Sequence, residues 1–103
     1  MASGRLGAVD LSATTNTTVY TVPATTTAAF SVSICNRNAT AVTVRLALSA
    51  TGTPGVTEWI EYDAPIAGNS VLERTGLILD AGKLVVAYAS AANVSVLAYG
   101  VEE

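Results

Sequence analysis

Hydrophobic side chains recur at every second position along most of this chain, which is the period of a β-strand buried on one face. In residues 42–48 the large aliphatic side chains take alternate positions, with Thr43, Arg45 and Ala47 between them. Residues 30–35 follow the same order, with serine and cysteine between the apolar positions. Both segments are therefore predicted to be half-buried strands.

Short segments of this kind, separated by Asn, Gly, Asp or Pro, fill the rest of the chain, and no segment has a helical period. Gly76 interrupts one of them and predicts a β-bulge there. The pattern predicts an all-β fold with seven or eight strands, an antiparallel β-sandwich of jelly-roll or immunoglobulin-like Greek-key topology. The expected strands are residues 18–22, 30–35, 42–48, 57–62, 71–79, 83–89 and 93–101, with 6–11 as the eighth.

Two connections have the chemistry of hairpin turns. Residues 36–40 are rich in Asn, which tolerates positive φ and bonds to nearby backbone. They predict an antiparallel hairpin between the strands on either side. The polar residues 90–93 interrupt the uncharged residues 84–101, so this stretch is predicted to be a buried hairpin and not a membrane span.

The composition indicates a small domain whose surface neighbours would help to cover. Half of the 103 residues are hydrophobic and 13% are charged, about half the ~25% of an ordinary soluble domain. A chain of this length removes only roughly 60–65% of its surface from water on folding. We therefore expect self-association or a partner to cover the surplus apolar surface. Residues 18–103 are predicted to form the sandwich, and residues 1–17 an arm or loop that contains at most one strand.

The residue inventory argues against several function classes. Histidine is absent and the five basic residues are scattered, so the commonest general base and a dense cationic stripe are both missing. We expect no enzyme, no cofactor, no metal, no nucleic-acid partner and no membrane. Residues 1–9 lack the apolar region of a signal peptide, which predicts synthesis and folding in the cytoplasm. Cys35, opposite the Phe30 face, has no base to activate it and is expected to be inert.

Acidic side chains concentrate at Glu58, Glu61 and Asp63. Strand alternation places Glu58 and Glu61 on opposite faces, so they cannot form the facing pair of a glycosidase. We expect these carboxylates to be solvated or to pair with Arg45 or Arg74. The last two residues, both Glu, are expected to form a solvated tail.

The neighbouring aromatic residues, Trp59 and Tyr62, allow two interpretations. Alternation places them on opposite faces of their strand but does not say which face is buried. Trp59 is therefore either a core side chain or an anchor in a partner interface.

Five segments carry a further signal: residues 19–24 (VYTVPA), 34–37 (ICNR), 59–63 (WIEYD), 72–76 (LERTG) and 87–90 (AYAS). In this order they resemble small β-rich virion structural proteins of tailed bacteriophages. The similarity covers residues 19 to 103 and includes no catalytic signature. It implies a virion location and a structural role, with phage capsid or tail proteins as partners.

Within that family resemblance we expect a capsid decoration (cement) protein that self-associates, with a trimer as the expected oligomer, and binds neighbouring shell subunits. The alternatives are a tail- or baseplate-associated structural protein and a glycan-binding adhesion module. An arm of residues 2–11 would add a strand to a neighbouring subunit. The expected partner-interface residues are Leu6, Val9, Leu11, Trp59 and Tyr62.

Overall fold

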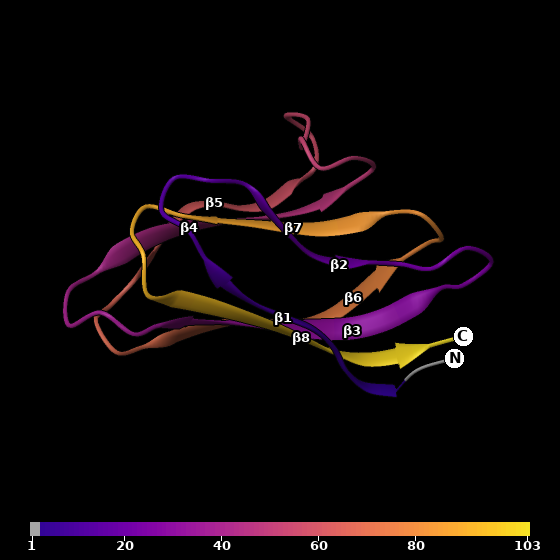
Figure 1. Ribbon diagram of the computed structural model, residues 1–103, viewed down its shortest axis with the longest axis horizontal. Coiled ribbons are helices and arrows are strands. Elements are labelled where there is room, and N and C mark those ends of the chain that lie inside the picture. Colours follow the sequence, from indigo (N-terminus) through magenta and orange to yellow (C-terminus); the bar gives the residue numbers. More distant parts are fainter. Residues whose placement is uncertain (1–2) are drawn as a thin grey trace.

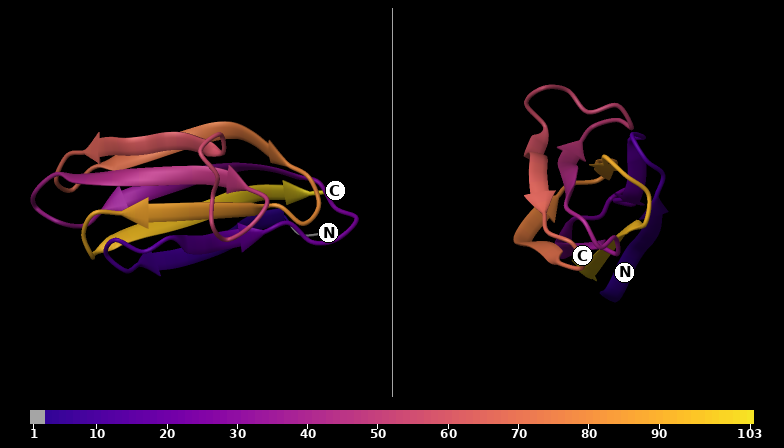
Figure 2. Two further views of the ribbon diagram at one scale, coloured as in Figure 1. Left: turned by 90° about the horizontal axis from the view of Figure 1, so that it is seen from above. Right: turned by 90° about the vertical axis from the view of Figure 1, so that its left-hand side faces the viewer.

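The computed structural model describes residues 3–103, in which every regular element is a β-strand (Figure 1). Two four-stranded sheets, ordered β1-β8-β3-β6 and β2-β7-β4-β5, pack face to face (Figure 2). The predicted antiparallel β-sandwich is confirmed. No helix in the described part of the chain is long and apolar enough to span a membrane. The strands are β1 (Ser3–Leu11), β2 (Thr17–Thr21), β3 (Ala28–Asn36), β4 (Val42–Ser49), β5 (Trp59–Ile66), β6 (Val71–Leu79), β7 (Leu84–Ala89) and β8 (Val94–Glu102).

The strand order selects one of the two topologies that the sequence left open. β1 pairs with β8, β2 with β7, β3 with β6 and β4 with β5, all antiparallel. Two further pairs, β3 with β8 and β4 with β7, complete the sheets. This is the order of a jelly roll, in which a long double ribbon of paired strands wraps around one core.

Both predicted hairpins are wrong. β3 and β4 lie in different sheets, and so do β7 and β8. The segments after β3 and after β7 therefore cross the sandwich, and among consecutive strands in residues 3–103 only β4 and β5 pair. Asn and Gly permit the chain to reverse, but they do not specify whether the next strand pairs or crosses the gap of about 10 Å between sheets.

Asn36 holds the crossing from β3 to β4. Its fully buried side-chain amide donates to the carbonyl oxygens of Thr40, Ile66 and Ala67 at 2.9–3.1 Å. Its Oδ1 accepts the backbone N–H of Asn38 at 2.9 Å. One side chain thus fastens the β3–β4 crossing to the segment that follows β5.

The core between the sheets is thin and mostly aliphatic. Its two aromatic side chains, Tyr20 and Phe30, meet edge to face with ring centroids 6.2 Å apart.

The predicted bulge at Gly76 is confirmed: Ser31 of β3 faces two residues of β6, and Gly76 has a φ of 71°. The extra residue turns Leu77 into the core and leaves Ile78 outside, 66% exposed.

The expected arm is an edge strand of the chain's own sandwich over residues 3–11. β1 pairs with β8 along its length, because β8 would otherwise be an open edge. Leu11 is buried, and Leu6 and Val9 are half-buried against the core. These three side chains thus pack against the chain's own core, and their contact with a partner stays a prediction. The first two residues of the expected arm lie outside the described residues.

Two side-chain pairs join the sheets. Arg74 of β6 donates to the Glu61 carboxylate of β5, and the Tyr20 hydroxyl of β2 donates to the Glu102 carboxylate of β8. Burial first, and the Glu102 carboxylate second, raise the pKa of Tyr20 well above its usual value. Glu102 is only 8% exposed, so the expectation of a solvated tail is wrong at this residue.

Candidate interaction surfaces

The outer face of the β2-β7-β4-β5 sheet carries an aromatic cluster around Arg45. A bulge in β5 makes both Tyr62 and Asp63 face Arg45 of β4, and Asp63 takes the left-handed conformation with a φ of 52°. In a regular strand these two neighbours would point to opposite faces. The bulge thus gives one arginine an aromatic ring and a carboxylate on the same surface.

The Arg45 guanidinium contacts the Asp63 carboxylate and two tyrosine rings. Its Nε and Nη2 donate to the two Asp63 oxygens at 2.7 and 3.3 Å. The guanidinium carbon lies 4.1 Å from the ring centroid of Tyr62 and 4.5 Å from that of Tyr88 on β7. Arg45 lowers the pKa of Asp63 below its usual range, chiefly through the hydrogen bond. The result is a fixed ion pair between two tyrosine rings.

Trp59 lies beside this pair on the same outer face. Its ring meets Tyr62 edge to face at 5.5 Å between centroids. A second irregularity in β5 makes Ile60 an extra residue, so the alternation that placed Trp59 and Tyr62 on opposite faces is wrong. With Val56, these two rings line an open groove of about 390 Å³. We call Arg45, Trp59, Tyr62, Asp63 and Tyr88 the aromatic platform.

The loop of residues 50–58 arches over this sheet (Figure 2) and borders the groove. The Glu58 carboxylate anchors it by accepting hydrogen bonds from the Ser49 hydroxyl and from the N–H groups of Ala50 and Gly55 at 2.8–2.9 Å. These donors, Gly55 first, lower the pKa of Glu58. Glu58 is therefore a loop anchor, whereas Val56 at the loop surface is 94% exposed.

Under the loop the outer face of this sheet has a small buried layer of its own. Val86 of β7 pairs with Ala47 of β4 and Thr18 of β2, and both Val86 and Ala47 are fully buried although they lie outside the main core. A Cβ placed on Gly52 would lie 3.9 Å from the Thr18 hydroxyl, which brings the loop across to β2. The chain thus covers part of this face itself.

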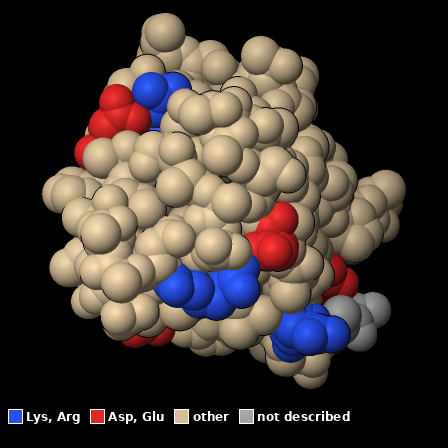
Figure 3. Space-filling model, turned by 60° about the vertical axis from the view of Figure 1, so that its left-hand side comes forward, with Lys and Arg blue, Asp and Glu red and all other residues tan. Residues whose placement is uncertain are grey.

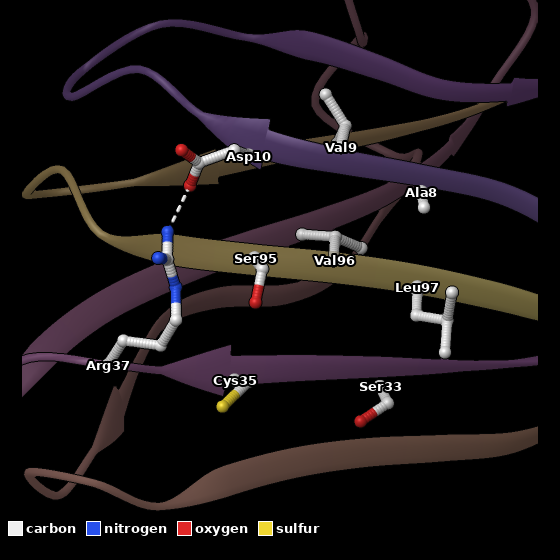
Figure 4. Close-up of a pocket in the computed structure, with 9 residues that line it drawn as sticks. All are labelled: Ala8, Val9, Asp10, Ser33, Cys35, Arg37, Ser95, Val96 and Leu97. Carbon is white, nitrogen blue, oxygen red and sulfur yellow. Dashed lines mark hydrogen bonds and ion pairs between the residues drawn. The ribbon is translucent and has the colours of Figure 1, made fainter.

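The outer face of the β1-β8-β3-β6 sheet differs. Small side chains from three adjacent strands, among them Ala8, Ser33 and Ser95, line a shallow hollow of about 620 Å³ (Figure 4). Arg37 reaches across the end of β8 to bond Asp10 at the rim of the hollow.

Exposed apolar side chains lie on the same face as this hollow. Val71 and Ile78 of β6 and Leu97 and Val101 of β8 are 38–66% exposed. Ala29 pairs with both Ile78 and Val101, so these side chains form one row across three strands. On the side of the molecule drawn in Figure 3, charged groups are few and lie in separate spots. We call this surface, with Val71, Ile78, Leu97 and Val101 as its apolar members, the bare face.

The structure resolves the remaining candidates. The expected arginine partners are confirmed, because Asp63 pairs with Arg45 and Glu61 with Arg74. Cys35 is a free, half-buried thiol on the outer face, opposite the Phe30 side as alternation predicted. Within residues 3–103 no three metal-ligating side chains gather.

Sequence reasoning missed Arg45 and Tyr88 as members of the aromatic platform. Neither lies near Trp59 in the chain, and only the pairing of β4 with both β5 and β7 brings them together. The bulge in β5 was also missed: Asp63 has a positive φ, which Asp adopts more readily than most residues, but an Asp within a strand pattern does not by itself mark a bulge.

Comparison of the chain with protein-family models, with curated proteins and with solved structures finds no match.

Proposed function

We propose that this chain is a structural protein of a tailed-phage virion, a capsid decoration protein that self-associates and binds neighbouring shell subunits. The resemblance of five ordered segments to such virion proteins supports this role. The fold is compatible with it, since jelly rolls occur widely in viral shells. The role is structural and needs no catalytic group.

The bare face is the observation that carries the proposal. Four exposed aliphatic side chains and a hollow lined by small residues occupy one broad sheet surface. Full burial of an exposed Val, Leu or Ile side chain gains roughly 1.5–3 kcal/mol, so each of these side chains, at 38–66% exposure, has about half of that left to gain. A neighbouring subunit that covers this face would remove the surplus apolar surface, and repetition over a lattice would multiply a modest contact.

Self-association is the second part of the proposal. The expected oligomer is a trimer whose subunits meet through part of the bare face while the remainder contacts the shell. The chain's own β1 fills the edge of β8, so the proposal does not require strand donation by an arm.

Incorporation into particles tests the role. We expect the chain in purified particles of the phage that encodes it, at shell positions in a reconstruction. Leu97→Asp and Ile78→Asp each place a charge on the bare face at an exposed position and should abolish incorporation. Val56→Asp, on the opposite face, is the matched control and should be incorporated normally.

Two results would contradict the proposal. One is a particle that lacks the chain or carries it only on the tail; a tail position would favour the tail-associated role. The other is normal incorporation of both bare-face variants. Light scattering of the purified protein tests self-association independently of particle binding. We expect a trimer for the native chain and a monomer for Leu97→Asp.

A further inference from the structure

The distribution of aromatic residues points to a second interaction site. The chain has one Trp, four Tyr and one Phe, and only Tyr20 and Phe30 lie in the core. Three of the others gather around Arg45 on one outer face. In a chain with so few large side chains, aromatic rings placed outside a thin core indicate binding of a ligand.

We propose that the aromatic platform binds a neutral glycan. One ring of the Trp59–Tyr62 pair would stack on the apolar face of a sugar ring and the other, inclined at 71°, would contact its edge. The Arg45–Asp63 pair lies beside the groove next to Tyr62 and would bond hydroxyl groups of a sugar that extends past it. This function is separate from the shell contact, because it uses the opposite face of the sandwich.

The lining of the groove, more than its size, favours a small ligand. The volume of the hollow on the bare face, about 620 Å³, and that of the groove, about 390 Å³, both lie within the range of about 300–1,000 Å³ that is common for small-molecule sites, but only the groove has aromatic walls. Val56, Trp59 and Tyr62 line it, whereas a standard protein partner contacts about 20–30 residues on each side. The residues of the neighbouring loop are mostly exposed Thr and Gly and do not extend the apolar surface.

The polar part of the platform fits hydroxyl groups. A guanidinium has five N–H donors, and Arg45 uses two of its nitrogens on Asp63. The Asp63 side chain is 47% exposed and keeps acceptor capacity. Two adjacent sugar hydroxyls, one accepting from Arg45 and one donating to Asp63, match this donor and acceptor pair. Because the two charges cancel, the platform favours a neutral ligand over an anionic one.

The platform is already ordered before any ligand binds. Two tyrosine rings hold Arg45, the β5 bulge fixes Asp63, and Glu58 anchors the loop that carries Val56. Preorganised groups lose little conformational entropy on binding, which favours the weak, polar recognition that is typical of sugars.

Trp59 provides a direct readout because it is the only Trp in the chain. We would screen the full-length protein on an array of neutral and anionic oligosaccharides, then titrate the best neutral oligosaccharide while recording Trp emission. A saturable change in Trp59 fluorescence is expected. Tyr62→Ala should weaken binding about tenfold, the loss expected for one aromatic contact.

Matched variants complete the test. Asp63→Asn keeps the shape and tolerates positive φ, and it should weaken binding several-fold by removing the carboxylate acceptor. Tyr99→Ala removes an aromatic residue from the bare face and should leave binding unchanged. The proposal is overturned if no neutral glycan is retained, if anionic glycans alone bind, if a protein is the only ligand found, or if Tyr62→Ala binds as well as the native chain.

Discussion

The two outer faces of this sandwich differ although both are formed by four antiparallel strands. On the β2-β7-β4-β5 sheet, Val86 points outward and is fully buried. On the β1-β8-β3-β6 sheet, Val101 also points outward and is 43% exposed. The same residue type on the same kind of surface thus has two environments, set by whether the chain covers it.

This difference shows how a small domain divides its surface. The loop of residues 50–58 and two bulges in β5 cover and shape one face, which gains a buried layer and an ordered aromatic platform. The bare face has no such cover within the described chain and presents exposed aliphatic side chains among small polar ones. A shaped face suits a small ligand, and a broad open face suits a neighbouring subunit.

The largest expected effect is a difference in the free energy of unfolding between substitutions at the two outward-facing valines, Val86 and Val101. Val86→Ala removes two buried methyl groups at about 1 kcal/mol each and should lower the free energy of unfolding by about 2 kcal/mol. Val101→Ala should change it by less than about 0.5 kcal/mol, because its side chain is already in contact with water. Urea titration of the monomeric Leu97→Asp background measures both without a contribution from association. Equal losses would show that the loop does not bury Val86.

A smaller effect tests how the two sheets are joined. Tyr20→Phe removes the hydroxyl that joins β2 to Glu102 of β8 and should cost about 1 kcal/mol at neutral pH. The pKa of Tyr20 is raised in the folded state, so its contribution is present below the ordinary value of about 10 and is lost as the pH rises above it.

The difference in unfolding free energy between the native chain and Tyr20→Phe should therefore shrink as the pH rises above 10. Urea titrations at a series of pH values measure it. A difference that is constant from neutral pH to above 10 would contradict the assignment of the buried hydroxyl.

The smallest effect is confined to the loop. Glu58→Gln weakens its anchor and should speed amide hydrogen exchange at Ala50 and Gly55 while leaving the sheets unchanged. The pKa of Glu58 is lowered, so the anchor is complete above the ordinary value of 4.5 and is lost as the pH falls through the lowered value. The amide shifts of Ala50 and Gly55 should titrate there in the native chain and stay flat in Glu58→Gln. Titration in both proteins would assign the change to another group.

Much of the local structure could be predicted from the sequence. Residues 42–48 alternate as expected, and the bulge at Gly76 follows from a single residue type that permits positive φ. The Arg45–Asp63 and Arg74–Glu61 pairs were among the pairings that opposite charge suggested. These features depend on neighbours in the chain or on simple complementarity.

The candidate site was predicted only in part. Trp59 and Tyr62 were selected as possible contact residues, but their strand was assigned a regular alternation that two bulges remove. Leu6, Val9 and Leu11 were assigned to a partner interface, but their packing against the chain's own core was missed, because an apolar terminal segment looks the same whether its own sheet or another receives it. The pairing of β1 with β8 could be seen only in the folded chain.

The sequence by itself determined the period-two pattern, the all-β class, the shortage of charge and the approximate positions of most strands, although β5 lies at Trp59–Ile66 and not at residues 57–62. The tertiary structure alone decided that consecutive strands mostly cross between sheets, that β1 closes its own sandwich, and that Arg45 meets residues from two other strands. The physical reason is that alternation and turn chemistry act over a few residues, whereas strand partners are chosen by the burial of a whole sheet face. A turn residue lets the chain reverse, and the common core determines where the next strand goes.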